Sequence, residues 1–431
     1  MRAGLPILPS VRSHWFTLHR LVLTAVLFVS FFWVYFQRMG LPVVIPQLEA
    51  TFGLSAVALG LLGAAYFYPY ALMQIPVGVL VDALGARWIL TLFVGAAGVG
   101  SLLFAWAGSF EEALAGRLLV GIGASAVWLA AQRLFVCWYH PRQFATINGL
   151  MNAVGNLGGL TASMPLAVVA AALGWRPAFA LVGGILLSMA ALCVVVVRDQ
   201  PHGGAPRPPQ KAGSAVGRAL PSITGNLRLV LCNREIWLLS AAMLPFVGTR
   251  FGFQSLWGGP YMTDVHGLDS AEVGLLLMVM SLAVALSGPI VGYLSDKVFT
   301  SRKRFSVLGF SLYTVVWVPL AFATDSVPVP VLYLLVIGMG CGSSFWLTVF
   351  AQTKEMYPVA LAGTALAVVN FSSTLGGAVY QQAMGVVIGL FEKTGGGYPV
   401  SAYSAAFLFC LVSAALSTAL VSISKESRQV G

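Results

Sequence analysis

The chain has 431 residues, of which 58 % are hydrophobic and only 9 % are charged, and its formal net charge is +10. Soluble proteins carry about 25 % charged residues, so this composition excludes ordinary cytosolic, secreted and disordered proteins. Nucleic-acid binding is also excluded, because it needs basic residues gathered on one soluble face and here they lie between apolar runs. We therefore expect a polytopic helical membrane protein.

Long runs without Asp, Glu, Lys or Arg indicate the membrane helices, since one span needs about 20 apolar residues. Nine runs qualify directly, and three more are interrupted only by arginine. The sequence therefore predicts an all-α protein with twelve transmembrane helices. In chain order the predicted spans are 21–48, 50–81, 88–110, 114–136, 143–175, 177–197, 236–263, 273–295, 305–324, 326–353, 356–391 and 394–424.

Lysine and arginine in the loops predict the orientation, because cytoplasmic loops carry an excess of both. With the N-terminus in the cytoplasm, almost all loop cations lie on that side, and the other side receives only Arg176 and Lys393. We expect an inner-membrane protein with both termini in the cytoplasm and no removed signal peptide. The predicted domains are a six-helix half at 1–197, a cytoplasmic linker at 198–234 and a second half at 235–431.

The two halves repeat each other in sequence. A shift of 214 residues aligns Asp82 with Asp296, and a shift of 218 aligns Asn152 and the pair at 158–159 with Asn370 and the pair at 376–377. Transporters are often built from such repeats. The repeat predicts two parallel, pseudo-symmetric six-helix halves.

Residues 78–87, GVLVDALGAR, resemble the G-x-x-x-D-x-x-G-x-R loop of the major facilitator superfamily, and residues 292–297 are a weaker copy. The resemblance covers essentially the whole chain and implies the twelve-helix fold of that family. Aspartates in these loops can accept hydrogen bonds from helix N-termini and pair with arginines, which would hold the cytoplasmic side closed. The residues predicted to act in gating are Asp82, Arg87, Asp296 and Lys297.

Within the superfamily the chain resembles the organophosphate:phosphate antiporters and the anion:cation symporters. The resemblance rests on Gln37-Arg38, on TRFG at 249–252 and on SDKVF at 295–299. In those antiporters an arginine of helix 1 and an arginine of helix 7 hold the substrate phosphate. The resemblance implies the same role for Arg38 and Arg250.

The residues alone also favour an anion site. An arginine in the bilayer costs at least about 2.5–3.5 kcal/mol, and no Asp or Glu lies deep in any predicted span to pair with Arg38, Arg117, Arg133 or Arg250. Guanidinium groups bind carboxylate or phosphate bidentately, so an external anion is the natural partner. The alternative is that an arginine reaches the membrane interface, which we expect first for Arg117 and Arg133.

The chain departs from the antiporter pattern at two positions, because it lacks the helix-5 histidine and has Gln74 where the family has a helix-2 lysine. We therefore widen the substrate to a small organic anion: a carboxylate, a sulfonate or a phosphate ester. Tyr66 and Tyr70 lie one turn apart on one helical face that Gln74 continues. The predicted substrate-binding residues are Arg38, Arg250, Tyr66, Tyr70, Gln74 and Trp257.

The sequence gives little support for coupling of transport to protons by a side chain of the protein. The five histidines lie in termini or loops, and no carboxylate lies deep in a span. This favours antiport with a counter-anion, or a proton carried by the substrate. Arg117 and Glu355 are the candidate coupling residues, and Arg117 resembles the helix-4 arginine of proton-coupled drug antiporters. The alternative function is therefore a proton-coupled exporter of a lipophilic or zwitterionic compound.

Other classes receive less support. A receptor of the same fold would favour a larger signalling tail than residues 425–431, and no HExxH, Walker loop or activated nucleophile indicates an enzyme. The five cysteines are scattered singly, without metal-ligand spacing. We expect no cofactor, no metal and a monomer in the bilayer.

Overall fold

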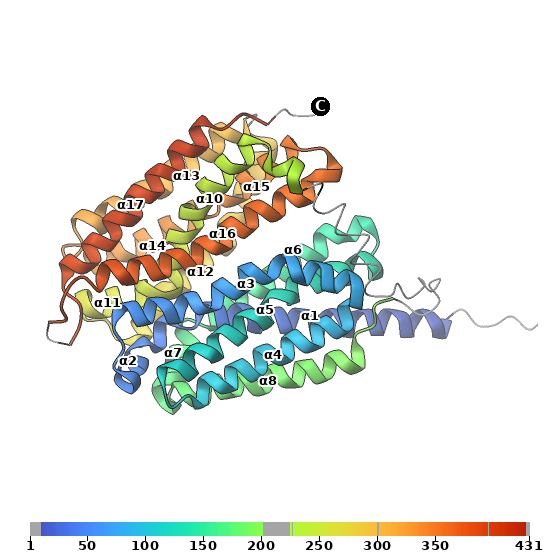
Figure 1. Cartoon of the computed structure of the whole chain (residues 1–431), viewed down its shortest axis with the longest axis horizontal. Helices are drawn as coiled ribbons and strands as arrows, with labels where there is room; N and C mark the ends of the chain where they lie inside the picture. The colour runs from blue at the N-terminus through green and yellow to red at the C-terminus, as the bar shows by residue number, and fades with distance from the viewer. Residues whose placement is uncertain (1–9, 201–224, 226, 300, 395, 428–431) are drawn as a thin grey trace, which may run out of the picture.

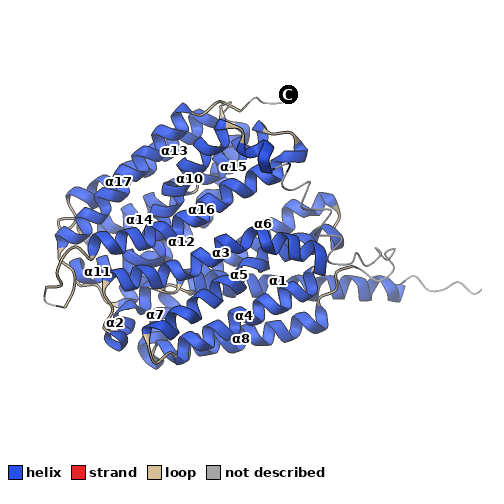
Figure 2. Ribbon diagram, in the orientation of Figure 1, coloured by secondary structure: helices blue, strands red, loops and turns tan. Residues whose placement is uncertain are grey.

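The computed structural model describes residues 10–200, 225, 227–299, 301–394 and 396–427. These residues form helices and connecting loops, and the one extended pairing among them is an isolated bridge between Thr394 and Gly397 (Figure 2). Most of the predicted linker at 198–234 lies outside the described residues.

The helices form two groups that lie one above the other in Figure 1. The N-terminal half consists of α1 (Ser10–Met39), η1 (Pro42–Val44), α2 (Ile45–Phe52), α3 (Ala56–Leu84), α4 (Ala86–Trp106), α5 (Phe110–Trp138), α6 (Pro141–Thr161), α7 (Met164–Leu173) and α8 (Trp175–Val196). The C-terminal half consists of α10 (Arg234–Gly252), the π-helical turn η2 (Phe253–Trp257), α11 (Gly258–His266), α12 (Ser270–Lys297), α13 (Arg302–Phe322), α14 (Val329–Ser343), α15 (Trp346–Met356), α16 (Val359–Ile388) and α17 (Val400–Ile423).

Twelve membrane spans are present when broken helices are joined. Eleven spans of the described chain are long and apolar enough to cross a bilayer, and α6 and α7 form a twelfth that bends by 41°. The bend follows from Pro165 in the first turn of α7, since proline cannot continue the hydrogen-bond ladder. The predicted fold class is therefore confirmed.

Equivalent glycines let helices cross closely in both halves. A Cβ atom on Gly158 of α6 would lie 2.1 Å from the carbonyl oxygen of Phe32 on α1. A Cβ atom on Gly376 of α16 would lie 2.0 Å from the carbonyl oxygen of Leu244 on α10. Small residues allow such backbone contacts between membrane helices. The sequence repeat thus corresponds to one packing contact that occurs twice.

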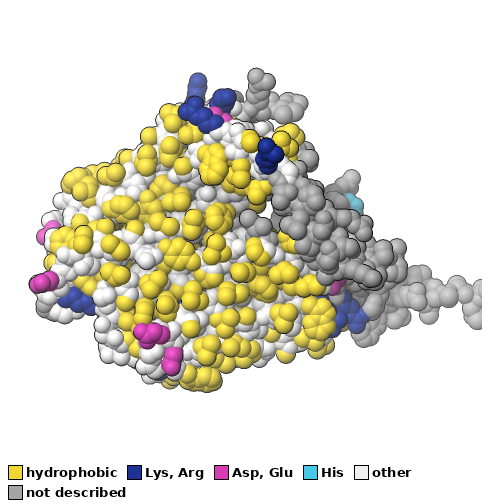
Figure 3. All heavy atoms as spheres, viewed as in Figure 1, with side chains coloured by type: hydrophobic (Ala, Val, Ile, Leu, Met, Phe, Trp, Pro, Cys, Tyr) yellow, Lys and Arg dark blue, Asp and Glu magenta, His cyan; other side chains and the backbone are white. Residues whose placement is uncertain are grey.

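The surface divides into an apolar side and two polar ends. The side seen in Figure 3 is covered with hydrophobic side chains, and Trp106, Val195 and Leu390 are at least 70 % exposed. Such exposure suits lipid contact. We call the end with most cations the basic end, and the other the opposite end. Cations at the basic end include Arg87, Arg198, Arg234, Lys297, Arg302, Lys303, Arg304, Lys354 and Lys425.

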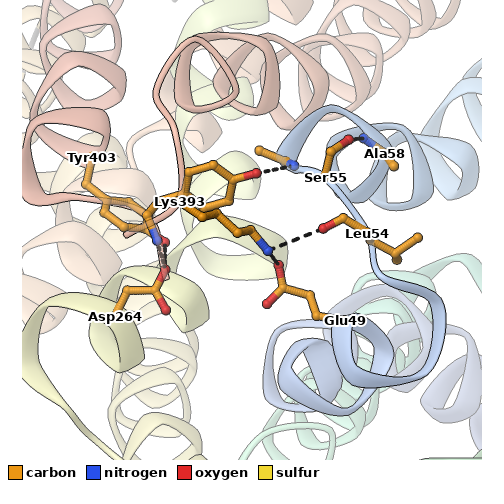
Figure 4. Close-up of polar contacts among 9 residues, drawn as sticks. Glu49, Leu54, Ser55, Ala58, Asp264, Lys393 and Tyr403 are labelled. Atoms are coloured by element: carbon orange, nitrogen blue, oxygen red, sulfur yellow. Dashed lines mark hydrogen bonds and ion pairs between the residues drawn. The ribbon is translucent and has the colours of Figure 1, made fainter. Parts of the chain in front are cut away.

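A loop between α16 and α17 closes the opposite end. We call its described residues, 389–394 and 396–399, the strap. Lys393 of the strap forms an ion pair of 2.9 Å with Glu49 of the N-terminal half and donates to the carbonyl oxygen of Leu54 at 3.4 Å (Figure 4). The hydroxyl of Tyr398 accepts a hydrogen bond from the backbone N–H of Ala56 at 2.7 Å.

The strap is fastened to its own half by Asp264 of α11. Its carboxylate accepts from the backbone N–H of Tyr398 at 3.0 Å and from the Tyr403 hydroxyl at 2.6 Å (Figure 4). A further polar contact between the halves joins the Tyr68 hydroxyl to Oε1 of Gln382 at 2.7 Å. The halves are thus joined from mid-depth to the opposite end.

Candidate functional site

A cavity of about 110 Å³ lies between the two halves, lined by α1, α10, α14, α15 and α16. Trp346 and Phe350 extend the lining along α15 toward the basic end. Two of the lining residues are arginines and none is acidic. The lining residues are Tyr35, Arg38, Phe246, Val247, Arg250, Ser343, Trp346, Phe350, Asn370 and Ser373.

Arg38 stands near the C-terminal end of α1 and is only 8 % exposed. Its Nε atom is buried and has no hydrogen-bond partner among the described residues. Aromatic rings surround the guanidinium instead, and a ring face attracts a cation. Ring centroids lie 4.7 to 5.9 Å from Cζ and belong to Tyr35, Tyr66, Phe67, Tyr70 and Phe251.

Arg250 reaches the same cavity from the last turn of α10. Its Nε–H donates to the side-chain oxygen of Gln254 at 3.1 Å, and its Cζ lies 5.1 Å from the ring centroid of Phe251. Phe251 therefore contacts both guanidinium groups. The two cations belong to opposite halves, so a ligand between them would touch both.

Arg117 does not reach the membrane interface, so that expectation is wrong. It is 1 % exposed on α5, and its Nη1 donates to the backbone carbonyl of Gln37 at 2.9 Å. Its Cζ lies 5.4 Å from the ring centroid of Tyr66. A buried carbonyl and a ring face replace the water that the interface would have supplied. Arg117 thereby supports the turn of α1 that carries Arg38.

The other predicted substrate-binding residues divide into two groups. Tyr66 and Tyr70 stack with centroids 5.9 Å apart and both face Arg38. All four residues lie outside the cavity lining, and Tyr66 and Tyr70 reach the site only through their contact with Arg38. Trp257 is fully buried, and its indole N–H donates to the backbone carbonyl of Gln381 at 2.8 Å.

The predicted gating residues lie at the basic end. Asp296 forms an ion pair of 2.7 Å with Arg302, which also pairs with Glu355 at 2.9 Å. The Ser427 hydroxyl donates to Glu355 at 2.6 Å, so this carboxylate lies outside the cavity. Lys297 is exposed in the last turn of α12.

Arg87 holds the ends of two helices together in the N-terminal half. Its guanidinium donates to the carbonyl of Val194 on α8, and its backbone N–H donates to the Asp199 carboxylate at 3.0 Å. The side chain of Asp82, on α3, lies outside the part of the chain that the structure describes.

Several residues that line the cavity were not predicted from the sequence. Phe246, Ser343, Phe350 and Ser373 are ordinary residues for a membrane helix, and no local pattern distinguishes them. Gln254 had a usable signal, because it follows Arg250 by four residues and therefore lies on the same helical face.

Two six-helix halves that meet around a basic cavity at mid-depth are the architecture of a membrane transporter. The chain belongs to the Major Facilitator Superfamily, whose family model matches residues 27–381 and again 258–428. It is accordingly a multi-pass membrane transporter.

The chain is similar to the probable sulfoacetate transporter SauU of Cupriavidus necator, with 26 % identity over 87 % of this chain and 88 % of that protein. It is 23 % identical to the glycerol-3-phosphate transporter of Bacillus subtilis over 86 % of each chain. These relatives confirm the resemblance to the organophosphate and anion transporter branches. Among solved structures, a bacterial homolog of the human lysosomal transporter Spinster, inward-facing and occupied, superimposes with a TM-score of 0.74 at 19 % identity, covering 94 % of this chain and 97 % of that one.

Proposed function

We propose that this transporter carries a small organic anion, held between Arg38 and Arg250, by alternating access. One observation carries the proposal: both arginines line a single cavity whose lining includes no acidic residue. Guanidinium groups stay charged at any physiological pH, and an uncompensated buried charge is costly. An anionic substrate supplies the missing counter-charge.

The cavity indicates a compact substrate. Its volume of about 110 Å³ is well below the roughly 300–1,000 Å³ typical of pockets for drug-sized ligands. The Asn370 amide offers hydrogen-bond donors on the side of the C-terminal half, whereas the hydroxyls of Ser343 and Ser373 donate to the carbonyls of Gly340 and Val369. A carboxylate, sulfonate or phosphate ester of a few carbons suits these groups. The names of the relatives, which include sulfoacetate and glycerol 3-phosphate, agree with this class.

The small cavity also disfavours the alternative, a proton-coupled exporter of lipophilic compounds. The coupling candidate Glu355 is paired with Arg302 at the basic end, and Glu49 is paired with Lys393 at the opposite end. Neither carboxylate lines the cavity. Exchange of one anion for another needs no proton site on the protein, so we favour antiport.

The excess of cations places the basic end in the cytoplasm in this proposal. The strap then lies on the outer side of an inner membrane, where its contacts join the two halves. In the transport cycle the strap would release the N-terminal half as contacts form at the basic end. One monomer contains both arginines.

The test is counterflow of labelled sulfoacetate in proteoliposomes, with malonate and glycerol 3-phosphate as competitors. Arg38→Lys and Arg250→Lys should each weaken binding at least about tenfold, because lysine keeps the charge but loses the planar fork. Arg304→Lys, at an exposed position of the basic end, is the matched control and should bind normally. Unchanged affinity in both cavity variants would reject the anion site.

A further inference from the structure

The Nε–H of Arg250 has a directional partner, whereas the Nε of Arg38 has none among the described residues. The Nε–H of Arg250 donates to Oε1 of Gln254 at 3.1 Å, and Nε2 of Gln254 donates to the Ser281 hydroxyl at 2.9 Å. The Ser281 hydroxyl in turn donates to the backbone carbonyl of Leu277 at 2.9 Å. A continuous chain of hydrogen bonds thus runs from the backbone of α12 to the cavity arginine.

The chemistry of these groups determines the direction of every bond. A guanidinium has no acceptor, so the Gln254 atom facing Arg250 must be the amide oxygen, and the amide nitrogen faces Ser281. The Ser281 hydroxyl donates its single proton to the backbone carbonyl of Leu277. It can therefore only accept a hydrogen bond from Gln254. No alternative amide orientation satisfies all three bonds, so the chain has one stable arrangement.

The backbone around Gln254 is unusual. Gln254 and Ser281 are 3 % and 7 % exposed, and Gln254 lies in η2, where the N–H of Gly258 bonds to the carbonyl of Phe253 five residues earlier. Single π-helical turns inside α-helices are frequent at functional sites. Here the turn begins directly after Gly252, three residues after Arg250, at the depth of the cavity.

We propose that Gln254 is a positioning residue that orients the guanidinium of Arg250 toward the transported anion. Because Nε is engaged by Gln254, only the edge formed by Nη1 and Nη2 can bind a ligand bidentately. Arg38 is held by rings and its Nε is free of protein partners, so it can present either edge. The two arginines therefore differ. Arg250 offers one fixed edge of its guanidinium to the anion, whereas Arg38 can turn either edge toward it. This inference rests on the proposed anion site.

The rank order of three variants tests the proposal, with sulfoacetate and glycerol 3-phosphate as binding probes on the purified full-length protein. Gln254→Ala removes the acceptor and should weaken binding about tenfold. Gln254→Glu keeps an acceptor on a side chain of the same length, but its carboxylate offsets the positive charge of Arg250. It should therefore weaken anion binding about 100-fold. Ser281→Ala leaves Gln254 unanchored and should cost about threefold.

A purely structural role gives the reverse order, because the isosteric Glu would disturb packing less than the cavity left by Ala. Gln352→Ala is the matched control: Gln352 is another buried amide of the same half that donates to a serine, Ser424, away from the cavity. It should bind both probes normally, and thermal unfolding of each variant reports folding independently.

Affinity in Gln254→Glu equal to or better than in Gln254→Ala would overturn the positioning role and leave the anion site standing. Binding that Arg250→Lys does not weaken would overturn the anion site, and the positioning role with it. The two failures are therefore distinguishable in one set of measurements.

Discussion

At the residue scale, the site combines a buried cation with aromatic faces. Tyr66 lies between two guanidinium groups, with its centroid 5.5 Å from Cζ of Arg38 and 5.4 Å from Cζ of Arg117. A ring face over a desolvated cation is worth about 2 kcal/mol or more. In the proposed site, aromatic rings would stabilise the empty arginine and leave its N–H donors free, whereas a carboxylate would compete with the substrate.

The ring of Tyr66, more than its hydroxyl, should therefore matter. The hydrogen bond that the hydroxyl donates to the carbonyl oxygen of Val34 is long, at 3.4 Å. Tyr66→Phe should bind anion within about twofold of wild type, whereas Tyr66→Leu should lose about tenfold in affinity through the lost cation–π contacts. Scintillation-proximity binding measures both. Equal affinities in the two variants would contradict the ring's role.

A site residue could be recognised from the sequence only where its polarity differed from that of its neighbours. Arg38 and Arg250 were identifiable as candidates because a charge in an apolar run is costly and needs a reason. The sequence could not predict that the Arg117 side chain points into the protein, because its partner is the backbone carbonyl of Gln37 on a different helix. Phe246 and Ser373 became site residues only through the arrangement of helices.

At the element scale, the helix crossings are determined by a few small residues. Gly158→Ala should prevent stable folding, since its Cβ would lie 2.1 Å from the Phe32 carbonyl oxygen. Gly159→Ala is the matched control, because its nearest neighbour is a Met39 side-chain carbon at 3.5 Å. Monodisperse protein recovered in detergent is the measurement. Normal recovery of Gly158→Ala would show that α1 and α6 can separate at little cost.

The repeat made the two halves predictable, but the irregular elements were not. Residues 143–175 read as one apolar run, yet the helix breaks before Met164 and bends by 41°. The π-helical turn at Phe253–Trp257 has no Pro or Gly inside it to indicate it. Both irregularities depend on packing between helices, which hydropathy along one helix does not contain.

The strap should set how often the opposite end opens. The Lys393–Glu49 pair is partly exposed, with side chains 34 % and 26 % accessible, so it is worth about 0.2–1 kcal/mol. Lys393→Ala should therefore raise the population open at that end up to about fivefold. The measurement is the rate at which an impermeant thiol reagent, added from that side, labels a cavity cysteine introduced as Ser373→Cys.

Two further variants make the strap experiment specific. Lys354→Ala removes an exposed lysine of the basic end and should leave the labelling rate unchanged. Combining Glu49→Lys with Lys393→Glu restores an ion pair of reversed sign and should return the rate toward wild type. Labelling that stays fast in the double variant would show that Lys393 acts through its bond to Leu54 instead.

At the scale of the whole molecule, ionisable groups are sorted by depth. The cavity lining contains arginine and tyrosine but no Asp, Glu, His or Lys. The carboxylates that the structure describes in ion pairs lie at the two ends, Glu49 with Lys393 and both Asp296 and Glu355 with Arg302. These pairs join elements at the ends, while the middle keeps a net positive charge. This distribution supports the proposed anion site at mid-depth and exchange without a proton site on the protein.

This arrangement predicts how transport depends on pH. Between about pH 5.5 and 8 neither arginine nor tyrosine changes charge, so binding should follow only the ionisation of the substrate. Exchange of sulfoacetate, whose sulfonate is a strong acid, should vary less than about threefold over this range and persist without a proton gradient. Glu355→Gln and Glu49→Gln should leave the profile flat, because each carboxylate serves an ion pair at one end. Exchange in proteoliposomes buffered equally on both sides measures this. A steep profile that becomes flat in one of the two variants would identify that glutamate as a proton site and make symport the correct mechanism.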